Sequence, residues 1–170
     1  MKLLRTANIW KPAEYQLGDV LKFEMNGKTV EAFAVKQEED GMIFLFRNCL
    51  DKEYPMNKVK RVLESLIDEI PEELKEMLKP FKSGEFFRLP TEKEIFGENL
   101  YGADEGEDIQ QWECMKERRN RISFDKSDYT EWYWLSNKVS APLFADVIYG
   151  GHADYANASL SFGIRPAFKI

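Results

Sequence analysis

The chain has 170 residues, of which 44% are hydrophobic and 14% aromatic, so it has enough apolar side chains for a substantial core and is not globally disordered. It carries 24 lysines and arginines against 30 aspartates and glutamates, a formal net charge of −6, which argues against a protein built to bind nucleic acid. The length suits a single domain over residues 1–170.

The sequence contains no targeting or membrane signal that we can identify. Residues 1–8 lack the sustained apolar region and the cleavage site of a signal peptide, and no apolar run is long enough to span a bilayer. We therefore expect no membrane partner and a location in the cytoplasm or in a particle assembled there. Cys49 and Cys114 lie far apart in the sequence, and reduced thiols are a simpler interpretation than a single disulfide.

The first third of the chain predicts three antiparallel strands. Apolar and polar residues alternate over 20–25, and Asn26-Gly27 follows, a pair that accepts the positive φ angles of a type I′ hairpin turn. Residues 28–36 are the expected return strand. The apolar run 42–46 is typical of a strand that is covered on both faces. Together these segments predict a β-meander.

The next segment changes to helical periodicity. Apolar residues recur at steps of three and four over residues 57–70, which predicts an amphipathic helix. Pro71 suits the first position of a second helix, with Glu72 and Glu73 in its first turn, and Pro80 ends it.

The middle of the chain predicts a strand and then a helix with a defined start. Residues 85–90 resemble a short strand. Thr91 and Glu94 are spaced as a capping box, in which each side chain accepts a hydrogen bond from the other residue's backbone amide. We expect these two residues to have a structural role and the helix to stop at Gly97.

A polar region separates this helix from the last quarter of the chain. Residues 102–108 form an acidic loop, and a helix capped by Asp108 is expected over 109–117. The basic cluster Arg118, Arg119 and Arg121 is best interpreted as a charged helix end that pairs with neighbouring acids.

The last quarter, residues 130–170, organises the predicted fold. Two strand-like apolar segments, 131–136 and 162–170, bracket a loop-rich insert. Ile164, Phe168 and Ile170 share one face of a strand, so the end of the chain is predicted to lie inside a sheet.

Arg165 lies within this predicted inner strand and faces away from Ile164 and Phe168. An isolated buried charge is costly, so we expect Arg165 to be paired and to have a structural role. The candidate partners are Glu92, Glu94 and, through a cation–π contact, the ring of Trp134.

With helices in the middle and strands at both ends, the fold class is α+β. Three motifs occur in order: Phe-Arg-Leu-Pro-Thr-Glu-Lys-Glu at 87–94, Trp-Tyr-Trp-Leu-Ser at 132–136 and Gly-Ile-Arg-Pro-Ala at 163–167. This order resembles a bacterial and phage domain family of unknown function with a Trp-Trp-Leu-Arg-Ser-Pro-like stretch and a C-terminal Gly-Val-Arg-Pro-Ala. It is also similar to a wider group with a C-type-lectin-like fold, which includes the formylglycine-generating enzymes.

The resemblance implies twisted antiparallel sheets with flanking helices, an N-terminal β-meander, a C-terminal strand in the sheet and a ligand surface on late loops. Two positions depart from the pattern. Ser136 directly follows Leu135 where the family has an arginine, and Asn137 stands where a proline is frequent. A shared fold does not carry a ligand with it.

The sequence predicts no metal, no cofactor and no catalytic residue. The lectin tripeptides that bind calcium are absent, and the acidic loop lacks a calcium-ligand spacing. His152 is the only histidine, which excludes a multi-histidine metal centre. No cysteine follows Cys114, so the late cysteines of formylglycine-generating enzymes have no counterpart.

The candidate binding residues lie in and before the insert. Its glycines permit unusual backbone conformations, and tyrosine, histidine, aspartate and asparagine are adaptable contact residues. A plain hairpin tip, and a purely core role for the tryptophans, are the structural alternatives. The candidates are Trp132, Trp134, Tyr149, His152, Asp154, Tyr155 and Asn157.

These observations favour a non-enzymatic, C-type-lectin-like binding or interaction domain of prophage origin. Its partner would be a protein, a small molecule or a glycan, and the oligomeric state is not indicated. The alternatives are an enzyme related to formylglycine-generating oxidases with altered chemistry, and a phage structural or assembly protein.

Overall fold

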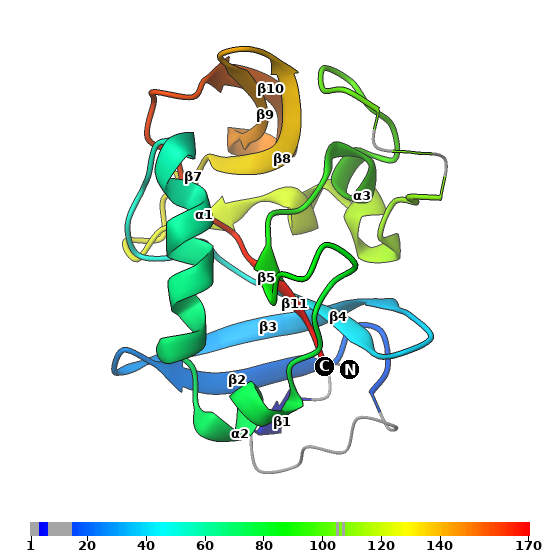
Figure 1. Cartoon of the computed structure of the whole chain (residues 1–170), viewed down its shortest axis with the longest axis vertical. Coiled ribbons are helices and arrows are strands. Elements are labelled where there is room, and N and C mark those ends of the chain that lie inside the picture. Colours follow the sequence, from blue (N-terminus) through cyan, green and yellow to red (C-terminus); the bar gives the residue numbers. More distant parts are fainter. Residues whose placement is uncertain (1–3, 7–14, 105, 107) are drawn as a thin grey trace. The chain divides into compact units, whose positions relative to one another are not determined.

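The computed structural model describes residues 4–6, 15–104, 106 and 108–170 (Figure 1). The chain forms two compact units. The meander unit comprises Met1–Arg47, Arg61–Arg88 and Pro166–Ile170, and the aromatic unit comprises Asn48–Lys60 and Leu89–Arg165. The mixed content of mostly antiparallel sheets and few helices is α+β, as the sequence predicts.

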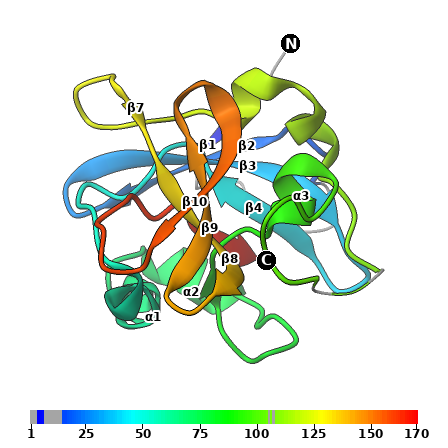
Figure 2. The ribbon, with the colours of Figure 1, turned by 90° about the horizontal axis from the view of Figure 1, so that it is seen from above.

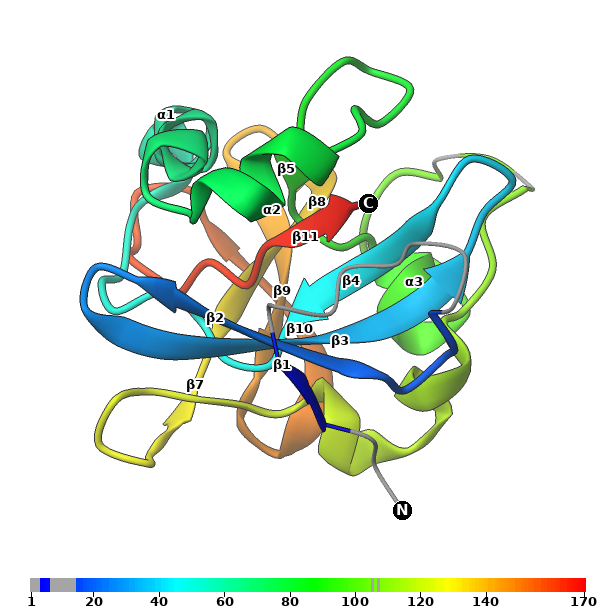
Figure 3. The ribbon, with the colours of Figure 1, turned by 90° about the horizontal axis from the view of Figure 1, so that it is seen from below.

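Within its described residues, the meander unit contains a six-stranded sheet in the order β1-β2-β3-β4-β11-β5 (Figure 3). All neighbours are antiparallel except β1 and β2. The strands are β1 (Leu4–Thr6), β2 (Val20–Met25), β3 (Lys28–Gln37), β4 (Met42–Phe46), β11 (Ala167–Lys169) and β5 (Phe87–Arg88). The predicted meander is confirmed.

The local signals of the meander behave as predicted. Asn26 and Gly27 have φ angles of 53° and 77°, which a type I′ turn requires. Every residue of β4 is buried, as expected for a strand with no solvent-facing side. The helices of this part of the chain are α1 (Met56–Ser65), the 3-10 turn η2 (Leu66–Asp68) and α2 (Glu72–Met77).

The C-terminal strand is central, as the sequence predicts. β11 lies between β4 and β5, and the Phe168 ring contacts the rings of Phe23, Phe44, Phe46 and Phe87 at centroid distances of 5.7–6.2 Å. Beyond the strand, Met42 and Ile170 exchange backbone hydrogen bonds of 2.7 and 3.1 Å. The last residues therefore hold the core of the meander unit.

The aromatic unit contains a three-stranded antiparallel sheet in the order β10-β9-β8 and a small β6-β7 pair (Figure 2). The strands are β6 (Ser123–Phe124), β7 (Thr130–Glu131), β8 (Tyr133–Ser140), β9 (Leu143–Ile148) and β10 (His152–Asn157). The helical segments are α3 (Glu92–Phe96), η3 (Glu113–Lys116), η4 (Arg118–Arg121) and η5 (Tyr149–Gly151).

Two predictions for this unit are wrong. The helix expected over residues 109–117 is only the short 3-10 segment η3, because Trp112 and Glu117 on either side of it have extended backbone angles. The insert between the apolar segments is not loop-rich, since β9 and β10 occupy most of it. Polar edge strands such as β10 lack the β-branched residues that make a strand visible in a sequence.

Arg165 is buried and hydrogen-bonded, as expected, and two of its partners, Asn120 and Tyr133, are residues that the sequence analysis did not name. Its Nη1 donates to the Asn120 carbonyl at 3.0 Å and to the Tyr133 hydroxyl at 3.1 Å. Its guanidinium also lies 5.3 Å from the centre of the Tyr133 ring. The Tyr133 hydroxyl in turn donates to the Arg121 carbonyl at 2.7 Å. This chain of contacts fixes β8 from one side.

Candidate binding surface on the three-stranded sheet

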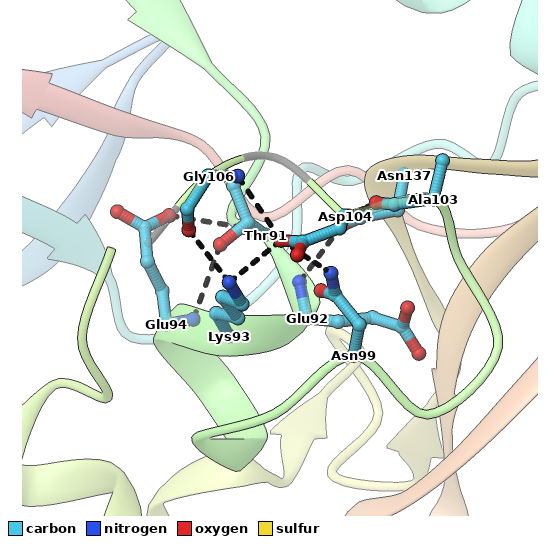
Figure 4. A network of polar contacts seen from close by, with 9 residues as sticks. All are labelled: Thr91, Glu92, Lys93, Glu94, Asn99, Ala103, Asp104, Gly106 and Asn137. Carbon is cyan, nitrogen blue, oxygen red and sulfur yellow. Dashed lines mark hydrogen bonds and ion pairs between the residues drawn. The ribbon is translucent and has the colours of Figure 1, made fainter. Parts of the chain in front are cut away.

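The capping box of α3 is confirmed and anchors the candidate surface (Figure 4). The Glu94 amide donates to Thr91 Oγ1 at 3.1 Å, and the Thr91 amide donates to Glu94 Oε1 at 2.9 Å. This reciprocal bonding fixes the first turn of the helix. It also fixes Glu92, the first residue of α3, which is fully buried.

Glu92 links this helix to β8 and to the loop that follows α3. Its backbone amide donates to Asn137 Oδ1 at 2.8 Å. Its two carboxylate oxygens accept hydrogen bonds from the backbone amides of Tyr101, at 3.1 Å, and Gly102, at 2.6 Å. Asn137 also donates to the Ala103 carbonyl at 3.1 Å. Because two consecutive amides are fixed, the loop presents Tyr101 in a defined position.

Tyr101 and Tyr155 form an exposed aromatic pair. Tyr155 lies on β10, and its ring centre is 5.0 Å from that of Tyr101 at an interplanar angle of 56°. The two residues are 45% and 44% exposed. Sequence reasoning selected Tyr155 but missed Tyr101, because nothing local indicates that Glu92 positions it. Exposed rings on anchored backbone provide contact area at little entropic cost.

A second aromatic cluster includes the two candidate tryptophans. Trp132 lies 5.3 Å from the ring of Tyr149, which is 59% exposed, and 5.4 Å from Phe162. Trp134 is fully buried, packs against Phe162 at 4.6 Å and donates its indole N–H to the Tyr54 carbonyl at 2.9 Å. Trp134 is therefore a core residue and does not offer its ring to a ligand, whereas Tyr149 does.

The other candidates have mixed roles. His152 is exposed at the start of β10. Asn157 ends the strand and closes the next turn, since its Oδ1 accepts from the Ser159 amide and its carbonyl from the Leu160 amide, both at 3.0 Å. Asn157 thus has a structural role. Asp154 is half-buried in the middle of β10.

Asp154 lies directly opposite an acid that the sequence analysis did not single out. Asp146 on β9 pairs with Asp154 in the register of the sheet. Asp146 is 1% exposed, and neither carboxylate oxygen has a hydrogen-bond partner among the described residues. Burial, and secondarily the charge of Asp154, raises the pKa of Asp146 to about 7. A lone aspartate inside the apolar run 143–148 was the available signal.

A second missed group surrounds Gly163, the glycine of the C-terminal motif. A Cβ atom there would lie 2.7 Å from Cys49 Sγ and 2.9 Å from Glu131 Oε1, which explains the glycine. Burial and then the nearby acids Glu53, Asp125 and Asp51 raise the pKa of Glu131 to about 7. Burial raises the pKa of the Cys49 thiol to about 12, so this thiol is protonated at neutral pH.

Both cysteines are free thiols, in agreement with the simpler interpretation. The Ser123 hydroxyl donates a hydrogen bond to Cys49 Sγ at 3.0 Å and accepts one from the Cys49 backbone amide at 2.9 Å. These two hydrogen bonds attach β6, which contains Ser123, to the segment around Cys49. A neutral thiol held in this way is a structural group.

The acidic loop is partly fixed by protein groups. Asp104 Oδ1 accepts from Lys93 at 2.6 Å, from Gly106 at 3.0 Å and from Asn99 at 3.1 Å (Figure 4). The hydrogen bond from Lys93 is the main cause that lowers the pKa of Asp104. Residues 105 and 107 lie outside the described residues. In the described ranges, no three His, Cys, Asp or Glu side chains gather in an arrangement that could hold a metal ion.

Comparisons with known proteins identify no relative of this chain. A scan of family models finds no match, and searches of curated proteins and of solved structures find no significant match. In the described part of the chain, no helix is long and apolar enough to cross a membrane. The geometry of the aromatic unit is therefore the basis for a functional proposal.

Proposed function

We propose that this chain is a non-enzymatic binding domain of the C-type-lectin-like type, which takes a protein or glycan ligand on the surface around β10. The observation that carries the proposal is the exposed Tyr101–Tyr155 pair, fixed by the buried carboxylate of Glu92. Tyrosine rings on a rigid support are typical anchors of binding surfaces. The exposed ring of Tyr149 adds a further contact at the end of β9.

The lectin-like assignment draws support from the motifs and their places in the structure. Gly163 is required by close side chains, Arg165 is buried with its partners, and β11 is a central strand. In such a domain the late segments carry the ligand while the sheet supports them, which agrees with tyrosines on β10 and beside it.

A double substitution tests this proposal. Tyr149→Ala with Tyr155→Ala removes two exposed rings and should leave the melting temperature within a few degrees of wild type, while binding is lost. The control is Tyr129→Ala, because Tyr129 is 73% exposed and lies in the turn between β6 and β7. The probes are a glycan array and a bacterial lysate passed over the immobilised chain.

The outcomes separate clearly. A ligand retained by wild type and Tyr129→Ala but lost from the double variant supports the proposal. A ligand that all three proteins retain places the site elsewhere. Unfolding of the double variant would assign the two rings to the core.

A catalytic function is the second candidate, and the observation that favours it is Glu131. A carboxyl group with a pKa near 7 is suited to general acid–base chemistry. The protonated Cys49 beside it argues against a thiolate reaction of the formylglycine-generating type. An activity found in a substrate screen and lost in Glu131→Gln, with folding intact, would favour the enzyme over the binding domain.

A further inference from the structure

The outer edge of β10 is open. β10 pairs with β9 over six consecutive residues without a bulge, and no residue of β10 is fully buried. Among the described residues, the backbone of 152–156 makes no hydrogen bond beyond this ladder. An edge of this kind is a template for another strand.

The opposite edge of the same sheet is closed, which makes the contrast informative. On β8 the Trp134 amide donates to the Gly163 carbonyl at 3.1 Å and the Ser136 amide to the Pro90 carbonyl at 3.0 Å. The Lys138 carbonyl accepts from the Ala103 amide at 2.9 Å. The backbone groups on the β8 edge of the sheet are therefore hydrogen-bonded to other segments of the chain, whereas those on the β10 edge are left for another molecule.

These contacts also determine which groups of β10 point outward. The Trp134 amide faces away from β9, so its pair with Asp146 is not hydrogen-bonded. Asp146 must then direct its backbone N–H and C=O toward β10. There they pair with the C=O and N–H of Asp154, which lies directly opposite. By alternation, the free N–H and C=O groups of the edge belong to Ala153 and Tyr155.

The edge lacks the devices that block pairing. Natural edges are protected by proline, by bulges or by several charges, and β10 has the sequence His-Ala-Asp-Tyr-Ala-Asn. Its single formal charge is Asp154. A docked strand would place alternate side chains against Tyr155 on one face and against Asp154 on the other.

The charge on this edge indicates the chemistry of the occupant. Asp154 and Asp146 are directly opposite one another, and the buried carboxylate of Asp146 is unpartnered in the described structure. Like charges directly opposite in a sheet destabilise it, and a cation beside Asp154 would relieve this. A second copy of the chain would instead add another acid pair and a further net charge of −6.

We propose that β10 takes an extended peptide segment of another protein as an added strand, with a lysine or arginine facing Asp154 and apolar residues facing Tyr155. This inference rests on the proposed binding function and specifies its partner. The backbone groups of Ala153 and Tyr155 supply affinity, and the side chains that alternate along β10 supply specificity.

Labelled synthetic peptides test the proposal by fluorescence anisotropy with the full chain. The probe is a peptide of about nine residues, longer than a typical strand, that alternates valine with threonine and has a central lysine. Its matched control has a central glutamate. We expect the lysine peptide to bind and the glutamate peptide to bind at least about tenfold more weakly.

Two proline variants test the backbone contacts. Ala153→Pro removes an outward N–H and leaves the ladder with β9 intact, and the preceding His152 already has φ −92° and ψ 150°, which a following proline accepts. The Ala153→Pro variant should stay folded and should no longer bind the lysine peptide. The matched control Ala156→Pro removes an N–H that faces β9 and should lower the melting temperature.

A charge reversal keeps the test decisive if Ala153→Pro unfolds. Asp154→Lys should bind the glutamate peptide in preference to the lysine peptide. Equal binding of both peptides to wild type, no binding of either, or normal binding by folded Ala153→Pro would overturn the proposal. So would a dimer of the wild-type chain that Ala153→Pro converts to monomer, because the occupant would then be a second copy.

The two proposals fail separately. If the lysine peptide does not bind, but an array or lysate ligand is still lost from the Tyr149/Tyr155 variant, the strand-docking proposal is wrong and the binding function stands. If the peptide binds but that variant keeps every array and lysate ligand, the tyrosine surface is wrong.

Discussion

β11 and β10 are both short strands near the end of the chain, and they illustrate opposite uses of a strand. β11 has a neighbour on each side, and Phe168 at its centre contacts four other phenylalanines. β10 has a neighbour on one side only, and its tyrosine is exposed. A strand with both edges paired contributes stability, whereas a strand with a free edge contributes a surface that another molecule can use.

The comparison predicts its largest effect at the C-terminus. Deletion of residues 164–170 removes β11, the Phe168 ring and Arg165, and leaves β4 and β5 with unpaired edges. The truncated chain should not fold, and circular dichroism should show no cooperative thermal transition. A truncated protein that melts cooperatively near the full-length midpoint would contradict the central role of β11.

A smaller effect is expected at Arg165. Arg165→Lys cannot reproduce the two bonds of Nη1 to Asn120 and Tyr133, and the loss of a hydrogen bond to a charged group costs about 1.5–3 kcal/mol. Urea denaturation measures this change. The control is Arg119→Lys, because Arg119 is 80% exposed in its pair with Glu117 and should change stability by less than about 1 kcal/mol. Equal stabilities for the two variants would show that the contacts of Arg165 are not important.

The sequence was most informative where local chemistry is decisive. Asn26-Gly27 and the Thr91–Glu94 box depend on backbone geometry within four residues, and both predictions are confirmed. The alternation of Ile164, Phe168 and Ile170 on one face indicated the strand β11 at the end of the chain. The contact between Arg165 and Tyr133 joins positions far apart in the sequence, and no periodicity encodes it.

The candidate surface was only partly predictable for the same reason. Tyr149 and Tyr155 were found from composition, but Tyr101 depends on Glu92, and Asp146 depends on the register of β9 with β10. β10 itself resembled a loop because a half-exposed edge strand has no strong apolar alternation. Residues that act through tertiary contacts become visible only with the fold.

A pH-dependent effect is expected beside β10, at Asp146 on the neighbouring strand β9. The pKa of Asp146 rises from 3.8 to about 7 on folding, so the folded state binds more protons between these values and stability falls as pH rises through them. Asp146→Asn removes this loss. At pH 8 it should raise the melting temperature relative to wild type, with a gain of at most about 4 kcal/mol in the free energy of unfolding. At pH 4 it should give little gain.

The control for this prediction is Asp154→Asn on the same cross-strand pair. Asp154 is half-buried, so its substitution should change stability less than Asp146→Asn at pH 8. A wild-type-like pH profile in Asp146→Asn would show that another group causes the dependence, with Glu131 as the next candidate.

Amide hydrogen exchange in β10, followed by NMR on the free chain, tests most directly whether this strand is folded with an open outer edge. The register predicts alternation: the amides of Asp154 and Ala156 bond to β9 and exchange slowly, whereas those of Ala153 and Tyr155 face outward and exchange fast. Equal protection of all four amides would show that the edge is covered. Equally fast exchange at all four would show that β10 is not a stable strand, and either result would contradict the account.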